Sequence, residues 1–219
     1  MTDTLCTILW DMDGTIVDTK DCHFFTWQRA LEKHGYTLDH GVFEANFGRN
    51  NKTLVPLYLG FQPGADFMEE IIEDKEILFR QIAPQQVSLV PGVISWLSKA
   101  DEMNFPQAIA SSAPMENISM MMEKFDLSNY FETIVSGVEL PAKPEPDIFV
   151  KAANNLGCSM RDCLVIEDSL AGVQAAKIAG MRCIAVTTSH PRTELGLADL
   201  VVDDFTGSLE DALRTLCWF

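Results

Sequence analysis

Two carboxylates stand two residues apart at the end of the first apolar run of the sequence. Asp11 and Asp13 lie in the segment 10–15 (WDMDGT), directly after the apolar run 5–10, and residues two apart in an extended chain project to the same side. One interpretation is a strand-ending turn in which Asp13 and Gly14 reverse the chain. The other is chemical: Asp11 attacks phosphorus and forms an aspartyl-phosphate, while Asp13 transfers protons.

A second acidic pair, Glu167 and Asp168, follows the apolar run 163–166. A carboxylate nucleophile approaching an anionic phosphoryl group needs a cation, and a few hard oxygen ligands that share a phosphate fit Mg²⁺. Because neighbouring residues of an extended chain point in opposite directions, we assign Asp168 the inner metal position and Glu167 a supporting or alternative one. The competing interpretation is an acid-rich helix start before Ser169.

Two serines and a lysine complete the set of candidate residues. Ser111 ends the run 107–111, and Ser112 follows it before Pro114. Hydroxyl and free N–H groups at such a helix start form a phosphate cradle, or merely an N-cap. Lys143 lies in the rigid turn 142–147 (AKPEPD). It is either a solvated surface charge or the positive group that the acidic site otherwise lacks.

The elements that must position these residues alternate between strand and helix. Continuous apolar runs predict strands that are buried on both faces, and helical patterns with three-to-four spacing separate most of them. This alternation predicts an α/β fold with a doubly wound parallel sheet, whose ligands bind beyond the carboxyl ends of the strands. The predicted strands are 5–10, 107–111, 133–136, 163–166, 183–186 and 200–202, and the helices between them are 92–103, 115–125, 147–156 and 169–179.

One long stretch after the first strand contains helical patterns only. Apolar faces in residues 21–34 and 66–82 and turns near Gly35 and residues 60–64 divide it into about four helices. Lys75 falls on an apolar face, and we expect its stem to extend toward solvent. We therefore predict a catalytic core of residues 1–16 and 87–219 and an inserted helical cap of residues 17–86.

Composition restricts the class of partner. The 219 residues include 16 basic and 32 acidic ones, a formal charge of −16, which disfavours nucleic-acid and anionic-membrane binding. No apolar run is long enough for a membrane span, no secretory leader pattern opens the sequence, and the six cysteines form no CxxC pair. We predict a cytoplasmic protein, a monomer or small homo-oligomer, whose partner is a small phosphorylated metabolite.

The order and spacing of these segments resemble the haloacid dehalogenase (HAD) superfamily. Its four motifs match residues 11–15, 109–112, 143–147 and 165–180, and the resemblance extends over essentially the whole chain. It implies a Rossmann-like core with an inserted helical cap. Asp18, Thr19, His23 and Trp27 resemble the linker and first cap helix of the subfamily that contains β-phosphoglucomutase and sugar-phosphate phosphatases.

The resemblance also implies a role for each matched residue. Asp11 would be the nucleophile and a magnesium ligand, and Asp13 the general acid and base and a ligand through its carbonyl. Ser111 and Lys143 would hold phosphoryl oxygens, and Asp168 with Glu167 would complete the metal site. Thr19 and His23 would lie at the hinge near Asp13, although His23 could instead cap a buried helix start.

The predicted function is a Mg²⁺-dependent phosphatase that acts on a small phosphorylated metabolite such as a sugar phosphate. The alternatives are a β-phosphoglucomutase-type mutase and a non-catalytic phosphometabolite-binding protein. The mutase group differs from this chain, which has Ala113 and Met115 at two usually polar positions. Its cap arginine has no match in register, and Arg49 and Lys52 are the nearest candidates.

Overall fold

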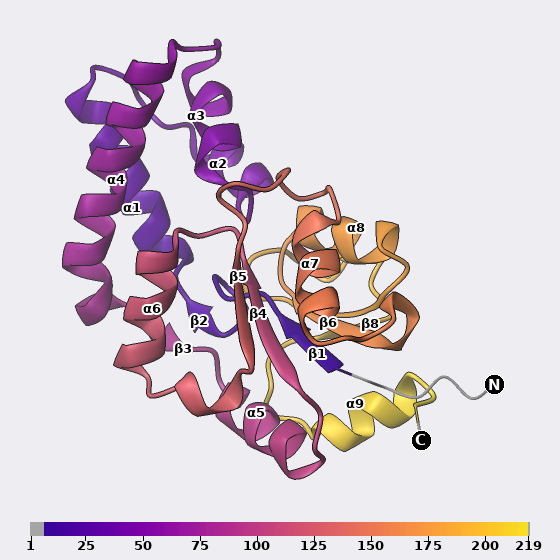
Figure 1. Cartoon of the computed structure of the whole chain (residues 1–219). Helices are drawn as coiled ribbons and strands as arrows, with labels where there is room; N and C mark the ends of the chain where they lie inside the picture. Colours follow the sequence, from indigo (N-terminus) through magenta and orange to yellow (C-terminus); the bar gives the residue numbers. More distant parts are fainter. Residues whose placement is uncertain (1–6, 219) are drawn as a thin grey trace.

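The computed structural model of the protein describes residues 7–218. In that part of the chain the central element is a six-stranded parallel sheet of order β5-β4-β1-β6-β7-β8 (Figure 1). Every strand lies where an apolar run predicts it, and residues 5 and 6 of the first predicted strand lie outside the described residues. The strands are β1 (Thr7–Trp10), β4 (Gln107–Ser111), β5 (Thr133–Ser136), β6 (Cys163–Glu167), β7 (Arg182–Val186) and β8 (Leu200–Val202).

Helices cover both faces of this sheet. Successive residues of β1 point to opposite faces, so that Ile8 and Trp10 belong to one buried cluster and Leu9 to the other. The first cluster includes residues of α5 (Val93–Glu102), α6 (Met115–Lys124) and α9 (Leu209–Thr215). The second includes residues of α7 (Asp147–Asn155) and α8 (Leu170–Ile178). The predicted doubly wound arrangement is therefore confirmed.

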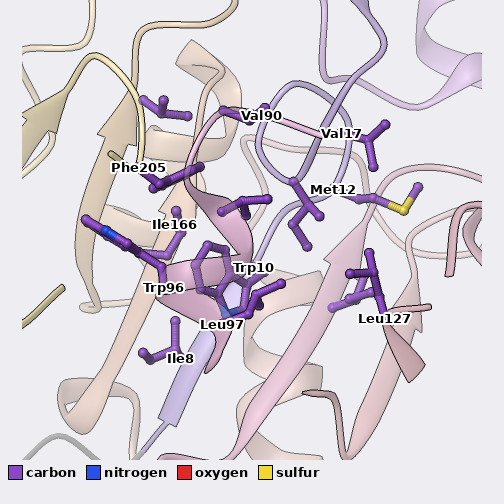
Figure 2. Packing of buried hydrophobic residues seen from close by; sticks show 14 of the residues in the cluster. Ile8, Trp10, Met12, Val17, Val90, Trp96, Leu97, Leu127, Ile166 and Phe205 are labelled. Atoms are coloured by element: carbon purple, nitrogen blue, oxygen red, sulfur yellow. The ribbon is translucent and has the colours of Figure 1, made fainter. Parts of the chain in front are cut away.

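The end of β1 lies inside the first cluster, where Trp10 packs among Trp96, Ile166 and Phe205 (Figure 2). The ring of Trp10 meets Phe205 edge-on with 5.8 Å between ring centroids, and its Nε1 donates to Oε1 of Gln107 at 3.0 Å. The ring of Phe205 also packs against the ring of Trp96, with 4.9 Å between the ring centroids. Because truncating a buried ring of this kind costs about 3–5 kcal/mol, the chain is held firmly at the residue before Asp11.

Four helices between residues 20 and 86 form the helical cap, which follows β1 in the chain and precedes the other strands of the six-stranded sheet (Figure 1). The cap has its own apolar cluster, which includes Trp27, Phe43 and Ile71. Asp39 and Asn50 cap two of its helices by accepting backbone N–H groups. The cap helices are α1 (Lys20–Lys33), α2 (His40–Asn46), α3 (Asn51–Leu59) and α4 (Ala65–Gln86).

A small second sheet lies where the chain leaves and re-enters the core. β2 (Val17–Asp18) pairs with β3 (Ser88–Leu89) in antiparallel orientation, and Gly92 follows in a turn with φ of 81°. A Cβ at Gly92 would lie 2.2 Å from the backbone of Phe205, so only glycine fits there. The remaining elements are two short 3₁₀ helices, η1 (Ser128–Tyr130) and η2 (Met160–Asp162). Among the described residues, no helix is long and apolar enough to cross a membrane.

Candidate active site

The acidic residues of the two sequence segments meet at the carboxyl edge of the sheet. β1 and β6 are neighbours in parallel register, with Trp10 opposite Ile166, so the residues that follow each strand lie side by side. Carboxylate oxygens of Asp11, Glu167 and Asp168 all lie within 4.8 Å of one another, and all three residues are buried. The strand-end argument thus brings both acidic pairs into one site.

Lys143 lies inside this cluster. Its side chain is 1% exposed, and its Nζ donates to Oδ1 of Asp11 at 2.5 Å and to Oε1 of Glu167 at 2.6 Å. Burial alone would lower the pKa of Lys143, but the charges of the two carboxylates outweigh it and raise that pKa. The interpretation of Lys143 as a solvated surface lysine is therefore wrong.

One lysine does not neutralise three buried carboxylates. Burial, with the charge of Glu167, raises the pKa of Asp11 to about 8 even though Lys143 opposes the shift. Burial and the charges of Glu167 and Asp11 also raise the pKa of Asp168. Compact, oxygen-only donors with an excess of negative charge fit a hard divalent cation such as Mg²⁺. The residues present therefore suit the predicted metal.

The two metal candidates of the second pair have different surroundings. Both oxygens of Glu167 are already engaged, Oε1 by Lys143 and Oε2 by the backbone N–H groups of Asp168 and Ser169 at 2.7 and 2.6 Å. The two oxygens of Asp168 accept neutral hydroxyl groups instead, Oδ1 that of Thr15 at 3.2 Å and Oδ2 that of Ser189. Asp168 is therefore the better placed of the two to ligate a cation directly.

Asp13 is held by two residues from the start of the cap. Its Oδ1 accepts from Oγ1 of Thr19 at 2.9 Å and lies 3.1 Å from Nε2 of His23. Burial would raise the pKa of Asp13, but His23 and Thr19 outweigh it and lower that pKa. The ring of His23 stacks on Phe79 at 4.2 Å. The helix N-cap at this point is Thr19, so His23 serves Asp13 and not the helix start.

The two serines have different partners, and only Ser111 has a contact with Asp13 among the described residues. Oγ of Ser111 lies 3.5 Å from Oδ2 of Asp13 and accepts the N–H of Ala113 at 3.1 Å. Ser112 donates its hydroxyl to the carbonyl of Gly48 in the cap at 2.9 Å. Ser111 therefore lies beside Asp13, whereas Ser112 joins the cap to the core.

A pocket between core and cap opens onto these residues. Asp11 and Asp13 line its core side, and Arg49, Lys75 and Glu76 line its cap side. Lys52, the other cation considered for the cap, lies in a different hollow and pairs with the exposed Glu139 at 3.2 Å. Of the two candidates, only Arg49 lies in the pocket with the nucleophile candidate.

The buried charges on the cap side escaped the sequence analysis. The expectation that Lys75 extends to solvent is wrong: the residue is 1% exposed, and its Nζ donates to Oε1 of Glu76 at 2.7 Å. Glu76 also accepts from the side-chain amides of Asn51 and Asn117 at 2.7 and 2.6 Å. A lysine beside a glutamate on a helix is usual on a surface, so the sequence carries no signal for this buried pair.

Two hydroxyl groups around Asp168 were also missed. Thr15 belongs to the first acidic segment, and Ser189 follows β7, whose carboxyl end lies beside that of β6. Their hydroxyls donate to Oδ1 and Oδ2 of Asp168, respectively. The strand-end rule that located Asp11 and Asp168 could have located Ser189 had it been extended to β7.

Comparison with known proteins agrees with this geometry. The model of the haloacid dehalogenase-like hydrolase family matches residues 8–186. The chain belongs to this family. It is 32% identical to a β-phosphoglucomutase of Bacillus subtilis over 89% of this chain and 88% of that protein. It is 26% identical to a phosphorylated carbohydrates phosphatase of Thermotoga maritima over 81% and 82%.

A solved structure shares the fold. The crystal structure of a β-phosphoglucomutase from Clostridium difficile superposes with a TM-score of 0.87 at 23% identity, covering 97% of each chain. The protein is therefore an enzyme of the HAD type that acts on phosphate esters, with a Rossmann-like core and a helical cap.

Proposed function

We propose that the protein is a Mg²⁺-dependent phosphatase of a small phosphorylated metabolite, of which a sugar phosphate is the leading candidate, and that it acts through a phosphorylated Asp11. The observation that carries this proposal is that Asp11 and Asp13 line the same pocket while the ammonium of Lys143 lies 2.5 Å from Oδ1 of Asp11. A nucleophile, a cation and a separately held proton carrier are the parts that phosphoryl transfer requires.

Asp11, Asp168 and the backbone carbonyl of Asp13 would hold the Mg²⁺, with Glu167 behind them. When bound, the ion supplies positive charge to the phosphoryl oxygens and lowers their repulsion of the nucleophile. Glu167 fixes Lys143 through its Oε1 and the backbone of Asp168 through its Oε2. We therefore assign Glu167 a supporting position and Asp168 the direct one.

In the first step a carboxylate oxygen of Asp11 attacks phosphorus in line with the leaving oxygen. The bond from Asp11 to phosphorus forms as the bond to the ester oxygen breaks, and Asp13 in its protonated form gives that oxygen its proton. Lys143 and the hydroxyl of Ser111 bind oxygens of the group in transfer and stabilise their charge. The alcohol leaves with its own oxygen.

In the second step Asp13, now a carboxylate, takes a proton from water while the water oxygen attacks phosphorus. The bond from phosphorus to Asp11 breaks, and inorganic phosphate and the free Asp11 carboxylate result. His23 and Thr19 orient Asp13 through its Oδ1, which leaves Oδ2 available to carry the proton. Asp13 thus returns to its protonated form for the next cycle.

Residues 17–86 form the cap domain of this proposal, and residues 1–16 and 87–219 the catalytic core. The cap contributes the half of the pocket that faces the leaving group, including Arg49 and Glu76. Apolar side chains, among them Trp27 and Phe43, line the cap side as well. The charged groups can bind hydroxyl groups of a metabolite, and the rings can pack against its carbon skeleton. We place the enzyme in the cytoplasm, as a monomer or small homo-oligomer without nucleic-acid or membrane partners.

The second candidate is a β-phosphoglucomutase-type mutase. It is favoured by the contacts of Thr19 and His23 with Asp13, which can keep the base inactive and protect the phosphoenzyme from water. Against it, two positions after Ser111 that are usually polar in the mutases are apolar here: Ala113 lines the pocket, and Met115 is exposed. Hydrolysis remains the preferred reaction.

A panel of phosphorylated metabolites incubated with Mg²⁺, with released phosphate as the readout, tests the proposal. We expect a sugar phosphate to reach kcat/KM of roughly 10⁴ M⁻¹s⁻¹ or more, and the D11N variant to release none. If no phosphate is released from any substrate, or if D11N releases as much as the parent, the proposal is wrong.

A further inference from the structure

We propose that Ser189 is a positioning residue that holds the carboxylate of Asp168 for Mg²⁺ and connects it to the cap through Lys20. This inference rests on the proposed function, because it concerns the affinity of the proposed metal site. It is carried by hydrogen bonds that run from cap helix α1 through the loop after β7 to Asp168.

The first link joins Ser189 to Asp168. The hydroxyl of Ser189 donates to Oδ2 of Asp168, and both residues are buried. Thr15 donates to the other oxygen of the same carboxylate at 3.2 Å. With one hydroxyl on each oxygen, rotation of the carboxylate about its last torsion is restricted. Groups that orient a metal ligand in this way typically change metal affinity 10- to 100-fold when removed.

The second link fixes the loop that carries Ser189. Thr188 donates its hydroxyl to the carbonyl of Gly14, in the turn that follows Asp11 and Asp13. Gly14 has φ of 89°, and a Cβ there would collide with both Asp168 and Ser189. The loop after β7 is therefore packed directly against the turn of the first acidic segment, and Ser189 has little freedom to leave Asp168.

The third link reaches the cap. Nζ of Lys20, at the start of α1, donates to the carbonyl of Ser189 at 2.9 Å and to Oε1 of Glu44 in α2 at 3.2 Å. Lys20 therefore ties two cap helices to the backbone of the residue that orients Asp168. A cap in the position seen here supports the metal ligand, and a cap that moved away from the loop would lose this contact.

Metal affinity without substrate is the most direct measurement. The midpoint of thermal unfolding is followed against Mg²⁺ concentration, since a ligand of the folded state raises this midpoint according to its dissociation constant. The variants are S189A, S189T and S189V. Threonine and valine have nearly the same shape, but threonine keeps the hydroxyl group that valine replaces with a methyl group. Ser189 lines a hollow together with Leu170 and Gly41, and we expect this hollow to accept the added methyl group. S98A, which loses a half-buried hydroxyl bonded to Tyr130, is the control.

We expect the Mg²⁺ dissociation constant to rise at least about tenfold in S189A and S189V and to stay within about threefold of the parent in S189T and S98A. K20M should raise it by a smaller factor, because it removes only the support of the loop. Equal constants for S189T and S189V, with both close to the parent, would overturn the assignment even if S189A failed to fold. A parent that does not bind Mg²⁺ would instead contradict the proposed metal site itself.

Discussion

Replacing Lys143 by methionine tests how much the ammonium of Lys143 stabilises the buried carboxylates of the site. The substitution keeps most of the volume of a side chain that is 1% exposed and removes an ammonium 2.5 Å from Asp11 and 2.6 Å from Glu167. Removing one partner of a buried ion pair costs about 3–5 kcal/mol, because the remaining charge stays buried without compensation. For a chain of this size each kcal/mol lowers the unfolding midpoint by about 2–4 °C, so we expect a decrease of roughly 6–20 °C.

The loss of stability should depend on pH in the metal-free protein. The pKa of Asp11 is raised to about 8, above its unfolded value. A carboxyl group with a raised folded-state pKa is neutral when folded at low pH, and its ionisation lowers stability as pH rises toward the folded value. Near pH 5 the folded protein therefore holds Asp11 mostly in its neutral form, and removing Lys143 leaves no charge on Asp11 without compensation. Near pH 9 Asp11 is mostly ionised, and its charge depends on Lys143 for compensation. K143M should lose more free energy of unfolding at pH 9 than at pH 5.

Urea unfolding in a chelator at both pH values, together with phosphatase kinetics, measures both effects. K151M, which removes an exposed lysine from α7, should stay within about 0.5 kcal/mol of the parent. K143M should also lose turnover and substrate affinity together, because in the proposed mechanism Lys143 would contact the phosphoryl group throughout transfer. Equal free energies of unfolding for K143M and K151M, or unchanged kinetics, would refute the reasoning.

Three further predictions concern the reaction. D11N should fold like the parent and lose turnover by several orders of magnitude, and residual kcat within about tenfold of the parent, or 1.4 kcal/mol in barrier, would rule out Asp11 as the nucleophile. A chelator should abolish activity and Mg²⁺ restore it, while Ca²⁺ should inhibit because it accepts more ligands at longer distances; full activity in excess chelator would contradict the metal site. With β-glucose 1-phosphate and a trace of glucose 1,6-bisphosphate, released phosphate should exceed glucose 6-phosphate, and the reverse ratio would favour the mutase.

The sheet and its helices could be predicted because their sequence signals are local and strong. Buried parallel strands appear as unbroken apolar runs, and α5 to α8 carry clear helical spacing. The pairing of β2 with β3 could not be predicted, since two residues on each side carry no periodicity. Helix α9, with seven residues, is short enough that its pattern does not stand out from the surrounding turns.

The candidate site also contains residues that could be predicted from the sequence and residues that could not. Asp11, Asp13 and Asp168 follow strand ends and Ser111 is the last residue of β4, and strand order alone brings such residues together. No comparable rule predicts which residues of the cap line the pocket, because the direction of each side chain depends on how the cap helices pack.

Lys75 illustrates the limit on the cap side. Its burial requires Glu76 beside it and the rings of Trp27 and Phe79 at 5.4 and 4.9 Å from its Nζ. Glu76 and Phe79 lie on the same helix as Lys75, but Trp27 comes from α1, and the packing of α1 on α4 that buries the lysine cannot be predicted from the local sequence.

The most direct test of the central claim is chemical detection of the phosphorylated nucleophile. p-Nitrophenyl phosphate needs little protonation of its leaving group, so a D13N variant should complete the first step and stall at the second, which needs a base. Rapid mixing with this substrate and Mg²⁺, borohydride reduction and peptide mass spectrometry should convert residue 11 from aspartate to homoserine. The product should appear only when substrate is present. Its absence, or homoserine at another aspartate, would contradict the assignment of Asp11 as the residue that accepts the phosphoryl group.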